Sequence, residues 1–180
     1  MAADARSAAL FALLTLAAGL PVRAAPPEGA PAPSSKTVVL RDQRGKAVGK
    51  VTLMDTAHGL LVRGSLKGLS RGLHAIHFHE TGKCEPPFKT AGGHFNPTQK
   101  AHGLMDPGGL HAGDLPNLIV PKGGKVEFEV FAEWLTLGDG PNTVLDADGT
   151  ALVIHARADD YRTQPSGDAG DRVACGVITR

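Results

Sequence analysis

The sequence contains no apolar run long enough to span a bilayer. Its longest run, Ala8 to Leu20, falls short of the roughly 20 residues that a transmembrane helix needs. Arg6 precedes the run and the small-residue pattern Val22-Arg23-Ala24 follows it, which predicts a secretory signal peptide over residues 1–24. No cysteine follows the run, so no lipoprotein signal is present. An uncleaved anchor or a disordered tail is the alternative.

The chain also lacks an excess of either charge. Lys and Arg number 19, Asp and Glu number 18, and the formal net charge is +1. Without the charged residues of the leader, Asp4, Arg6 and Arg23, the two signs are equal in number. A balanced chain gives no reason to expect nucleic acid as a partner, or a membrane once the signal peptide is cleaved.

Long helical periodicity is absent as well. A linker rich in Pro, Ala, Gly and Ser, which contains no histidine, is predicted over residues 25–36. After it, short apolar runs alternate with Gly, Asp and Asn, which predicts one all-β domain over residues 37–180, an antiparallel sandwich or barrel. The runs are residues 37–40, 47–54, 59–66, 72–79, 115–120, 125–131, 150–155 and 173–178.

Cysteine is nearly absent, with only Cys84 and Cys175 in the chain. In an exported protein these two residues are expected to form one disulfide. In the chain-entropy model, closing so long a loop stabilises the fold by about 4 kcal/mol. Two buried free thiols are the alternative, although Cys84 lies in a polar loop, where a buried thiol is not expected.

Histidine, in contrast, is concentrated between residues 71 and 114. His77 and His79 are two apart in an apolar run that reads as a strand, so their side chains leave the same face and can chelate one ion. Further ligand types follow among Gly, Pro and Asn, where the backbone can curl around a cation. Three imidazoles and one carboxylate suit zinc. These residues are His94, His102, His111 and Asp114.

Five blocks of this sequence resemble, in order, those of the bacterial type of copper,zinc superoxide dismutase. The resemblance extends from Thr37 to Arg180 and implies an eight-stranded antiparallel Greek-key barrel or sandwich with long metal-binding loops. The blocks are residues 72–80, Gly92-Gly93-His94-Phe95, residues 111–116, Ile154-His155-Ala156 and Ala174-Cys175-Gly176-Val177.

The resemblance also implies the metal ligands and the groups around them. Four nitrogen donors suit copper, and the carboxylate marks the other site as zinc-like. Seven ligand residues must fill eight positions, and the family assigns the shared position to His94. The copper ligands are then His77, His79, His94 and His155, and the zinc ligands are His94, His102, His111 and Asp114.

Asp159 matches the aspartate that accepts hydrogen bonds from one copper histidine and one zinc histidine. Arg172 matches the arginine beside the open copper position, where a fixed positive charge suits a small anion. Considered alone, Asp159 would be a turn residue, Arg172 a strand-edge residue and His155 an ordinary half-buried histidine.

Four residues that could attract a functional assignment receive none. The family treats the position of His74 as a structural histidine, and His58 lies in a turn where it is expected to be solvated. Met105 and Trp134 are expected to be loop and core residues.

The function implied by the resemblance is that of an exported enzyme, a superoxide dismutase that converts two superoxide anions and two protons into oxygen and hydrogen peroxide. Copper is alternately reduced and reoxidised, His94 takes up a proton when its bridge opens, and Arg172 steers the anion. The compartment is the periplasm if the host is Gram-negative. The bacterial type includes monomers and dimers, so a homodimer stays open.

Two other functions were weighed. A non-catalytic exported copper-binding or delivery module on the same barrel would be expected to lose Arg172 or a copper histidine, and both are present. A structural, adhesion-type sandwich leaves the ordered ligand residues unexplained.

Overall fold

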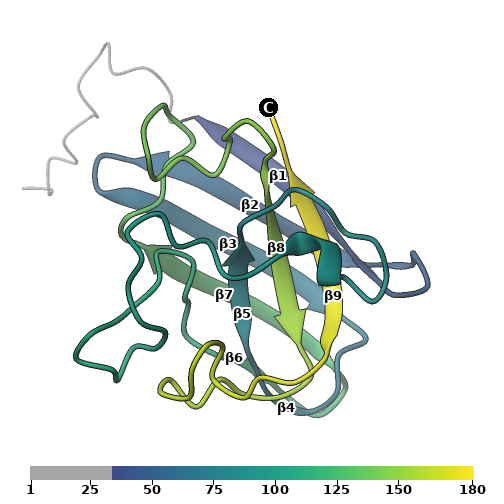
Figure 1. Ribbon diagram of the computed structural model, residues 1–180. Helices are drawn as coiled ribbons and strands as arrows, with labels where there is room; N and C mark the ends of the chain where they lie inside the picture. The colour runs from purple at the N-terminus through teal and green to yellow at the C-terminus, as the bar shows by residue number, and fades with distance from the viewer. Residues whose placement is uncertain (1–33) are drawn as a thin grey trace, which may run out of the picture. The chain divides into compact units, whose positions relative to one another are not determined.

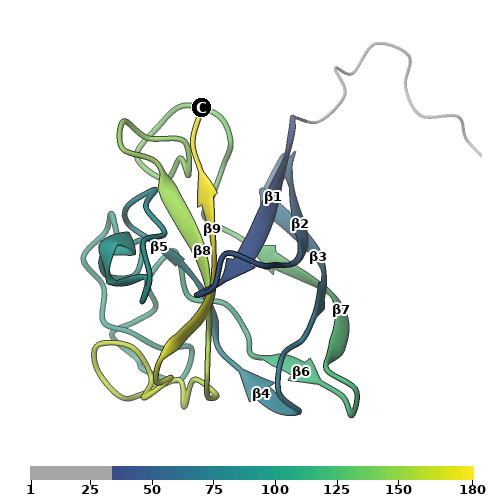
Figure 2. The same cartoon turned by 90° about the vertical axis from the view of Figure 1, so that its right-hand side faces the viewer.

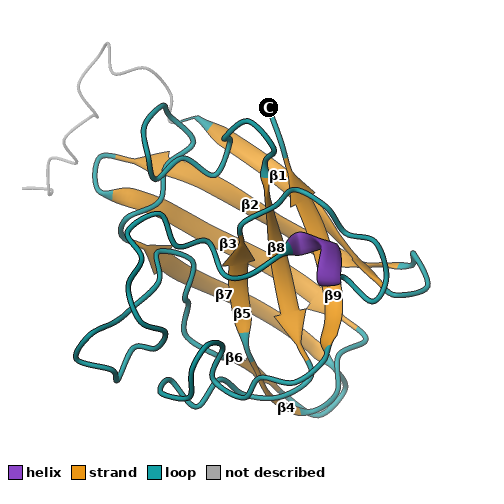
Figure 3. Ribbon diagram, viewed as in Figure 1, coloured by secondary structure: helices purple, strands orange, loops and turns teal. Residues whose placement is uncertain are grey.

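The computed structural model describes residues 34–180, so the predicted signal peptide and nearly all of the predicted linker lie outside the described residues. The described part is all-β apart from one short 3-10 helix, η1 (Lys89–Ala91), as Figures 1 and 3 show. Within residues 34–180, no helix combines the length and apolarity needed to cross a membrane. The strands are β1 (Ser35–Asp42), β2 (Ala47–Thr56), β3 (Gly59–Lys67), β4 (Gly72–His74), β5 (Ile76–His79), β6 (Leu118–Val120), β7 (Lys125–Ala132), β8 (Thr150–His155) and β9 (Arg172–Ile178).

Seven of the strands form one antiparallel sheet in the order β5-β8-β9-β1-β2-β3-β7, and β4 pairs separately with β6. The large sheet curls until β5, β8 and β9 face β2, β3 and β7, with β4 and β6 together at one end (Figure 2). Only Ala75 separates β4 from β5. Counted as one interrupted strand, they give the predicted eight-stranded antiparallel barrel, which is thereby confirmed.

Two of the predicted strands are interrupted or shortened in the structure, while the others differ from the observed strands by at most two residues at either end. The run over residues 72–79 is interrupted because Ala75 N–H donates to Arg157 O (2.8 Å), so Ala75 leaves the strand pairing. The run over residues 115–120 is a strand only from Leu118, because Pro116 has no N–H and Asn117 N–H is taken by Tyr161 Oη (2.7 Å). In addition, β1 already begins at Ser35, which pairs with β2.

The alternation of side chains along β8 separates two apolar clusters. Leu152 and Ile154 are fully buried in the main core inside the barrel. Ala151 and Val153 point the other way, into a smaller cluster beneath the loop that carries η1. His77 and His79 are the register partners of Val153 and Ala151, so both histidines lie on the outer face of the barrel.

A disulfide joins Cys84 in this loop to Cys175 on β9, with Cα atoms 5.7 Å apart and 91 residues of sequence separation. The predicted pairing is therefore confirmed. Phe88 and Ala91 pack beside Cys175 in the smaller apolar cluster. The disulfide and this cluster together fix the loop of residues 80–94 to the outer face of β8 and β9.

Removing the disulfide is expected to destabilise the barrel. Because Cys84 and Cys175 close a long loop, Cys175→Ser should lower the free energy of unfolding of the metal-free protein by about 4 kcal/mol. Urea unfolding of the variant and the wild type measures the difference, and reduced wild type serves as the control because it should match the variant. Equal unfolding free energies for the variant and the oxidised wild type would contradict this expectation.

Candidate metal centre

The free edge of β5 forms backbone hydrogen bonds with two loop segments that carry candidate ligands. Phe78 N–H donates to Gly113 O (2.9 Å), and Phe78 O accepts the N–H of Phe95 (2.8 Å). The loop is closed by Gly113 N–H, which donates to Phe95 O (2.9 Å). A Cβ on Gly113 would overlap Phe78 O, so only glycine permits this approach. His94 and Asp114 are thereby held beside the two histidines of β5.

The first set of side chains that could hold a metal ion comes from β5, from β8 and from the loop that follows η1. Their candidate ligand atoms all lie within 4.8 Å of one another, and each residue is buried. The structure therefore brings together all four residues that the sequence analysis assigned to copper. They are His77, His79, His94 and His155.

The second set meets the same criterion of 4.8 Å and is also buried. Asp114 Oδ1 lies 2.8 Å from His94 Nδ1 and 3.3 Å from His111 Nδ1. Its other oxygen, Oδ2, accepts the backbone N–H groups of Gly103 and His111, both at 3.0 Å. These contacts orient the carboxylate toward the histidines. The members are His94, His102, His111 and Asp114, which the sequence analysis assigned to zinc.

The hydrogen bonds of the first set leave one bare nitrogen on each ring. His79 Nδ1 is 3.0 Å from Gly92 O and His155 Nδ1 is 3.2 Å from Gly170 O, so each Nδ1 carries the donated hydrogen. Their Nε2 atoms, left as acceptors, face each other at 3.3 Å. Two lone pairs at that distance repel unless a cation lies between or beside them. Copper fits this donor set.

Three further ring nitrogens are buried without a hydrogen-bond partner: His77 Nδ1, His94 Nε2 and His102 Nδ1. His102 Nδ1 lies 3.1 Å from Asp114 Oδ2, but the contact does not have hydrogen-bond geometry. A buried polar atom without a hydrogen-bond partner costs free energy, so the three nitrogens of these two sets require a partner. A cation in each set supplies one, and the nitrogen and carboxylate donors of the second set suit zinc.

Asp159 joins the two sets. Its Oδ2 is 2.8 Å from His77 Nε2 and its Oδ1 is 3.0 Å from His102 Nε2, with all three side chains fully buried. These contacts place the hydrogen on Nε2 of each ring and leave Nδ1 free toward the metal side. A Cβ on Gly167 would overlap Asp159 Oδ1, so glycine at this position leaves room for the carboxylate.

Burial keeps three histidines of the first set neutral: His79, His94 and His155. It is the largest of the causes that lower the pKa of His155 to about 3, followed by the charges of neighbouring rings and of Arg172. Burial likewise lowers the pKa of His94 to about 4, although its contact with Asp114 opposes the shift. The pKa of His79 is held well below its ordinary value by burial, by His94 and by Arg172. Neutral imidazoles are the form that binds metal.

The second set differs from the first because it contains one carboxylate, Asp114, and contacts another, Asp159. Burial would lower the pKa of His102, but its contacts with Asp114 and Asp159 outweigh burial and raise the pKa to about 9. Burial would raise the pKa values of both aspartates, yet their contacts with histidines hold those values below the ordinary range. A metal ion in this set would take the place of the proton that His102 otherwise holds at Nδ1, beside Asp114.

Arg172 lies beside the first set because of a β-bulge. Ile154 pairs with Ala174 and His155 pairs with Arg172, so Val173 is the extra residue of β9. Ala174 and Val173 both pack toward the main core, which turns Arg172 to the outer face. Its guanidinium donates to Phe88 O and to Gly92 O, both at 2.7 Å.

Gly92 O accepts a hydrogen bond from His79 Nδ1 as well as from Arg172, so one carbonyl holds both groups. Burial lowers the pKa of Arg172, and Glu80 opposes that shift, but an arginine stays charged at neutral pH.

Asn117 and Tyr161 contribute to the site, although the sequence analysis did not identify them. The side chain of Asn117 pairs with the backbone of Asp159 in both directions: Nδ2 donates to Asp159 O, and Oδ1 accepts Asp159 N–H, both at 2.8 Å. Tyr161 Oη accepts Asn117 N–H, and Tyr161 N–H donates to Asp159 Oδ1 (2.6 Å). An Asn beside a Pro reads as an ordinary turn signal, so the sequence offered no clear indication of this role.

The remaining residues weighed from the sequence have no part in either set. His74 is buried, with Nδ1 2.7 Å from His155 O and Nε2 3.0 Å from Ser70 O, as a structural histidine would be. His58 is exposed. Met105 is 54% exposed in a loop, and Trp134 is 48% exposed, so the expectation of a core position for Trp134 is wrong.

Comparison with known proteins agrees with this geometry. The family described as copper/zinc superoxide dismutase matches residues 47–178. A Cu-Zn superoxide dismutase of Aquifex aeolicus is 46% identical over 142 residues, covering 77% of this chain and 83% of the relative. One of Caulobacter vibrioides is 45% identical and covers 80% and 85%. The crystal structure of a superoxide dismutase-like protein from Bacillus subtilis superposes with a TM-score of 0.77 at 42% identity, covering 79% of this chain and 97% of that one.

The barrel and its two ligand sets, which share one histidine, define a protein built around a pair of metal ions. The chain belongs to the copper/zinc superoxide dismutase family. It is an oxidoreductase that dismutes superoxide to oxygen and hydrogen peroxide, with copper and zinc as cofactors. Its bacterial relatives and its disulfide indicate an exported protein.

Neutralising Asp159 is expected to loosen both metals at once, because its two oxygens orient His77 and His102. Asp159→Asn should lower copper and zinc affinity by about tenfold to a hundredfold while the barrel stays folded. Metal retention during chelator challenge measures the effect. The control is Asp160→Asn, whose exposed carboxylate bonds only to its own loop, and unchanged retention in Asp159→Asn would argue against the assignment.

Truncating Asn117 tests whether the backbone of Asp159 must be clamped. Asn117→Ala removes two hydrogen bonds of about 1 kcal/mol each, so metal affinity should fall by about tenfold, less than in Asp159→Asn. Asn117→Asp keeps the acceptor for Asp159 N–H and should give an intermediate loss under the same chelator challenge. Wild-type retention in Asn117→Ala would show that Asp159 is held without this clamp.

Proposed function

We propose that each ligand set holds one metal ion, copper in the first and zinc in the second, and that one residue belongs to both sets. Copper is held by His77, His79, His94 and His155, and zinc by His94, His102, His111 and Asp114. The observation that carries this assignment is that the candidate ligand atoms of each set lie within 4.8 Å of one another, while each set contains buried ring nitrogens without a hydrogen-bond partner.

His94 is the proposed bridge. Its Nδ1 lies beside Asp114, and its Nε2 is directed to the first set without a partner. When bound, copper supplies a one-electron redox couple and zinc a fixed positive charge. His94 can take up a proton at Nε2 when that nitrogen is released and deliver it to the peroxide product.

The alternative, a non-catalytic copper-binding or delivery module, is less well supported. Such a module needs only the metal ligands and has no use for a fixed cation beside them. Here Arg172 is paired in register with His155 and shares the carbonyl of Gly92 with His79.

Arg172 is proposed to steer and dock superoxide. Its guanidinium is fixed by two carbonyl acceptors, so little conformational entropy is lost when an anion binds to it. The depressed pKa values of His79 and His155, lowered by burial and in part by the charge of Arg172, indicate that its field reaches the first set.

The location and extent of the mature protein are further proposals. A signal peptide over residues 1–24 and a linker over residues 25–36 would deliver the domain of residues 37–180 to the periplasm of a Gram-negative host. The disulfide is consistent with an oxidising compartment. Absence of a membrane partner after cleavage and association into a homodimer stay predictions.

Replacing Arg172 separates its effect on the anion from its effect on the fold. Arg172→Ile should reduce the second-order rate of superoxide consumption while metal content stays full, because Arg172 is not among the candidate ligands. Arg172→Lys should keep part of the rate, since it keeps the charge but loses the planar donor fork.

Salt dependence supplies the control for this experiment. Screening over roughly 8 to 10 Å at ordinary ionic strength should slow the wild type more than Arg172→Ile. Rates measured by pulse radiolysis across a salt series give the two slopes. Equal slopes, with full copper in both proteins, would assign steering to other residues.

A further inference from the structure

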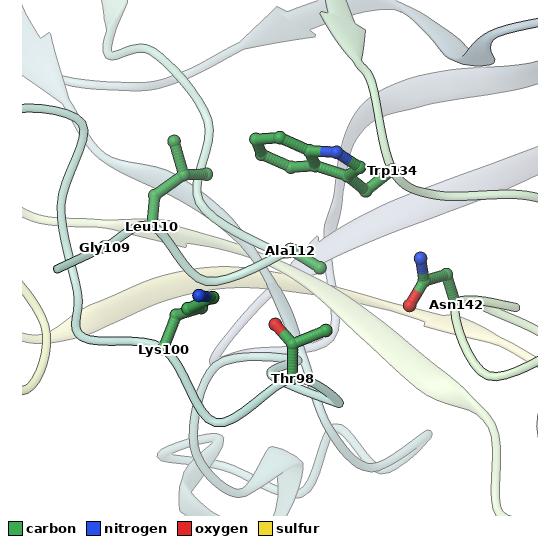
Figure 4. A pocket seen from close by; sticks show the side chains of 7 residues that line it. All are labelled: Thr98, Lys100, Gly109, Leu110, Ala112, Trp134 and Asn142. Carbon is green, nitrogen blue, oxygen red and sulfur yellow. The ribbon is translucent and has the colours of Figure 1, made fainter.

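A cavity of about 280 Å³ lies outside the two ligand sets, between the loop of residues 95–117 and the loop that follows β7. Figure 4 shows the side chains of Trp134, Thr98, Lys100 and Asn142 arranged around Ala112. Its volume is just below the usual range of roughly 300 to 1,000 Å³ for small-molecule sites, which suits a ligand with a single ring.

The walls of the cavity are of two kinds. The indole of Trp134, the only tryptophan in the chain, is 48% exposed and forms an apolar wall together with Leu110 and Ala112. An aromatic face of this kind is suited to stacking with a planar ring. A bare inorganic anion would leave this wall uncovered.

Each polar side chain that lines the cavity can donate a hydrogen bond and has no partner among the described residues. Within residues 34–180, Lys100 and Asn142 form hydrogen bonds only through their backbones, and the side chains of Thr98 and Trp134 form none. No carboxylate lines the cavity. Unpaired donors with one lysine among them are complementary to a negatively charged acceptor.

We propose that this cavity binds a small planar monocarboxylate, with its ring stacked on Trp134 and its carboxylate paired with Lys100. The hydroxyl of Thr98 and the amide of Asn142 complete the set of donors around the carboxylate. Leu110 and Ala112 flank His111 in the chain, so the bound molecule lies against the segment that carries one residue of the second ligand set. The site is separate from the one where superoxide reacts.

The test uses benzoate as the probe and the indole N–H of Trp134 as the reporter. The metal-loaded enzyme is reduced so that copper is diamagnetic, and its single indole resonance is followed by NMR during titration. Benzoate should shift the resonance saturably. Benzamide, which keeps the ring without the charge, and acetate, which keeps the charge without the ring, should bind at least about tenfold more weakly.

Two lysine variants complete the test. Lys100→Gln should weaken benzoate binding by about tenfold, because it removes the paired charge. Lys122→Gln is the matched control, since Lys122 is exposed in the turn between β6 and β7 and does not line the cavity. A non-saturating shift, or equal affinity in Lys100→Gln and wild type, overturns the proposal. So does a shift that follows protein concentration, which would mean that a second copy covers the cavity.

Discussion

The backbone of Phe78 is the point on which the arrangement of the metal centre depends. It lies at the free edge of β5, where its N–H and C=O bind two loop segments that are otherwise without regular structure. An exposed strand edge normally invites pairing with another chain. Here the edge is occupied by Phe95 and Gly113, each next to a candidate ligand. A rigid barrel thus supplies the precision that loops alone would lack.

In the metal-free centre, lone pairs of neighbouring histidines repel one another, and bound cations remove this repulsion. Acceptor nitrogens of His79 and His155 face each other, and His77 Nδ1 and His94 Nε2 are buried without a hydrogen-bond partner. The surrounding carbonyls and Asp159 enforce these orientations by taking the hydrogens of the opposite ring nitrogens. Because the folded protein supplies this geometry, metal binding and folding stability are coupled.

The loop of residues 80–94 connects the first ligand set to Arg172. The disulfide and the small apolar cluster fix it on β8 and β9. Its carbonyl at Gly92 then holds His79 on one side and Arg172 on the other. Arg172 and the candidate ligand His79 are therefore positioned by the same covalently anchored segment, on the outer face of the barrel.

The sequence by itself determined the position of most strands, the pairing of its two cysteines and the ligand types, because period-two alternation and the spacing of His77 and His79 are local properties of the chain. It did not determine the face on which Arg172 lies. Counting alternate residues back from Cys175 directs Arg172 into the core, and only the bulge at Val173 turns it outward. The clamp by Asn117 and the free nitrogen of each ring were likewise decided by the tertiary structure, since both arise from hydrogen bonds between segments distant in sequence.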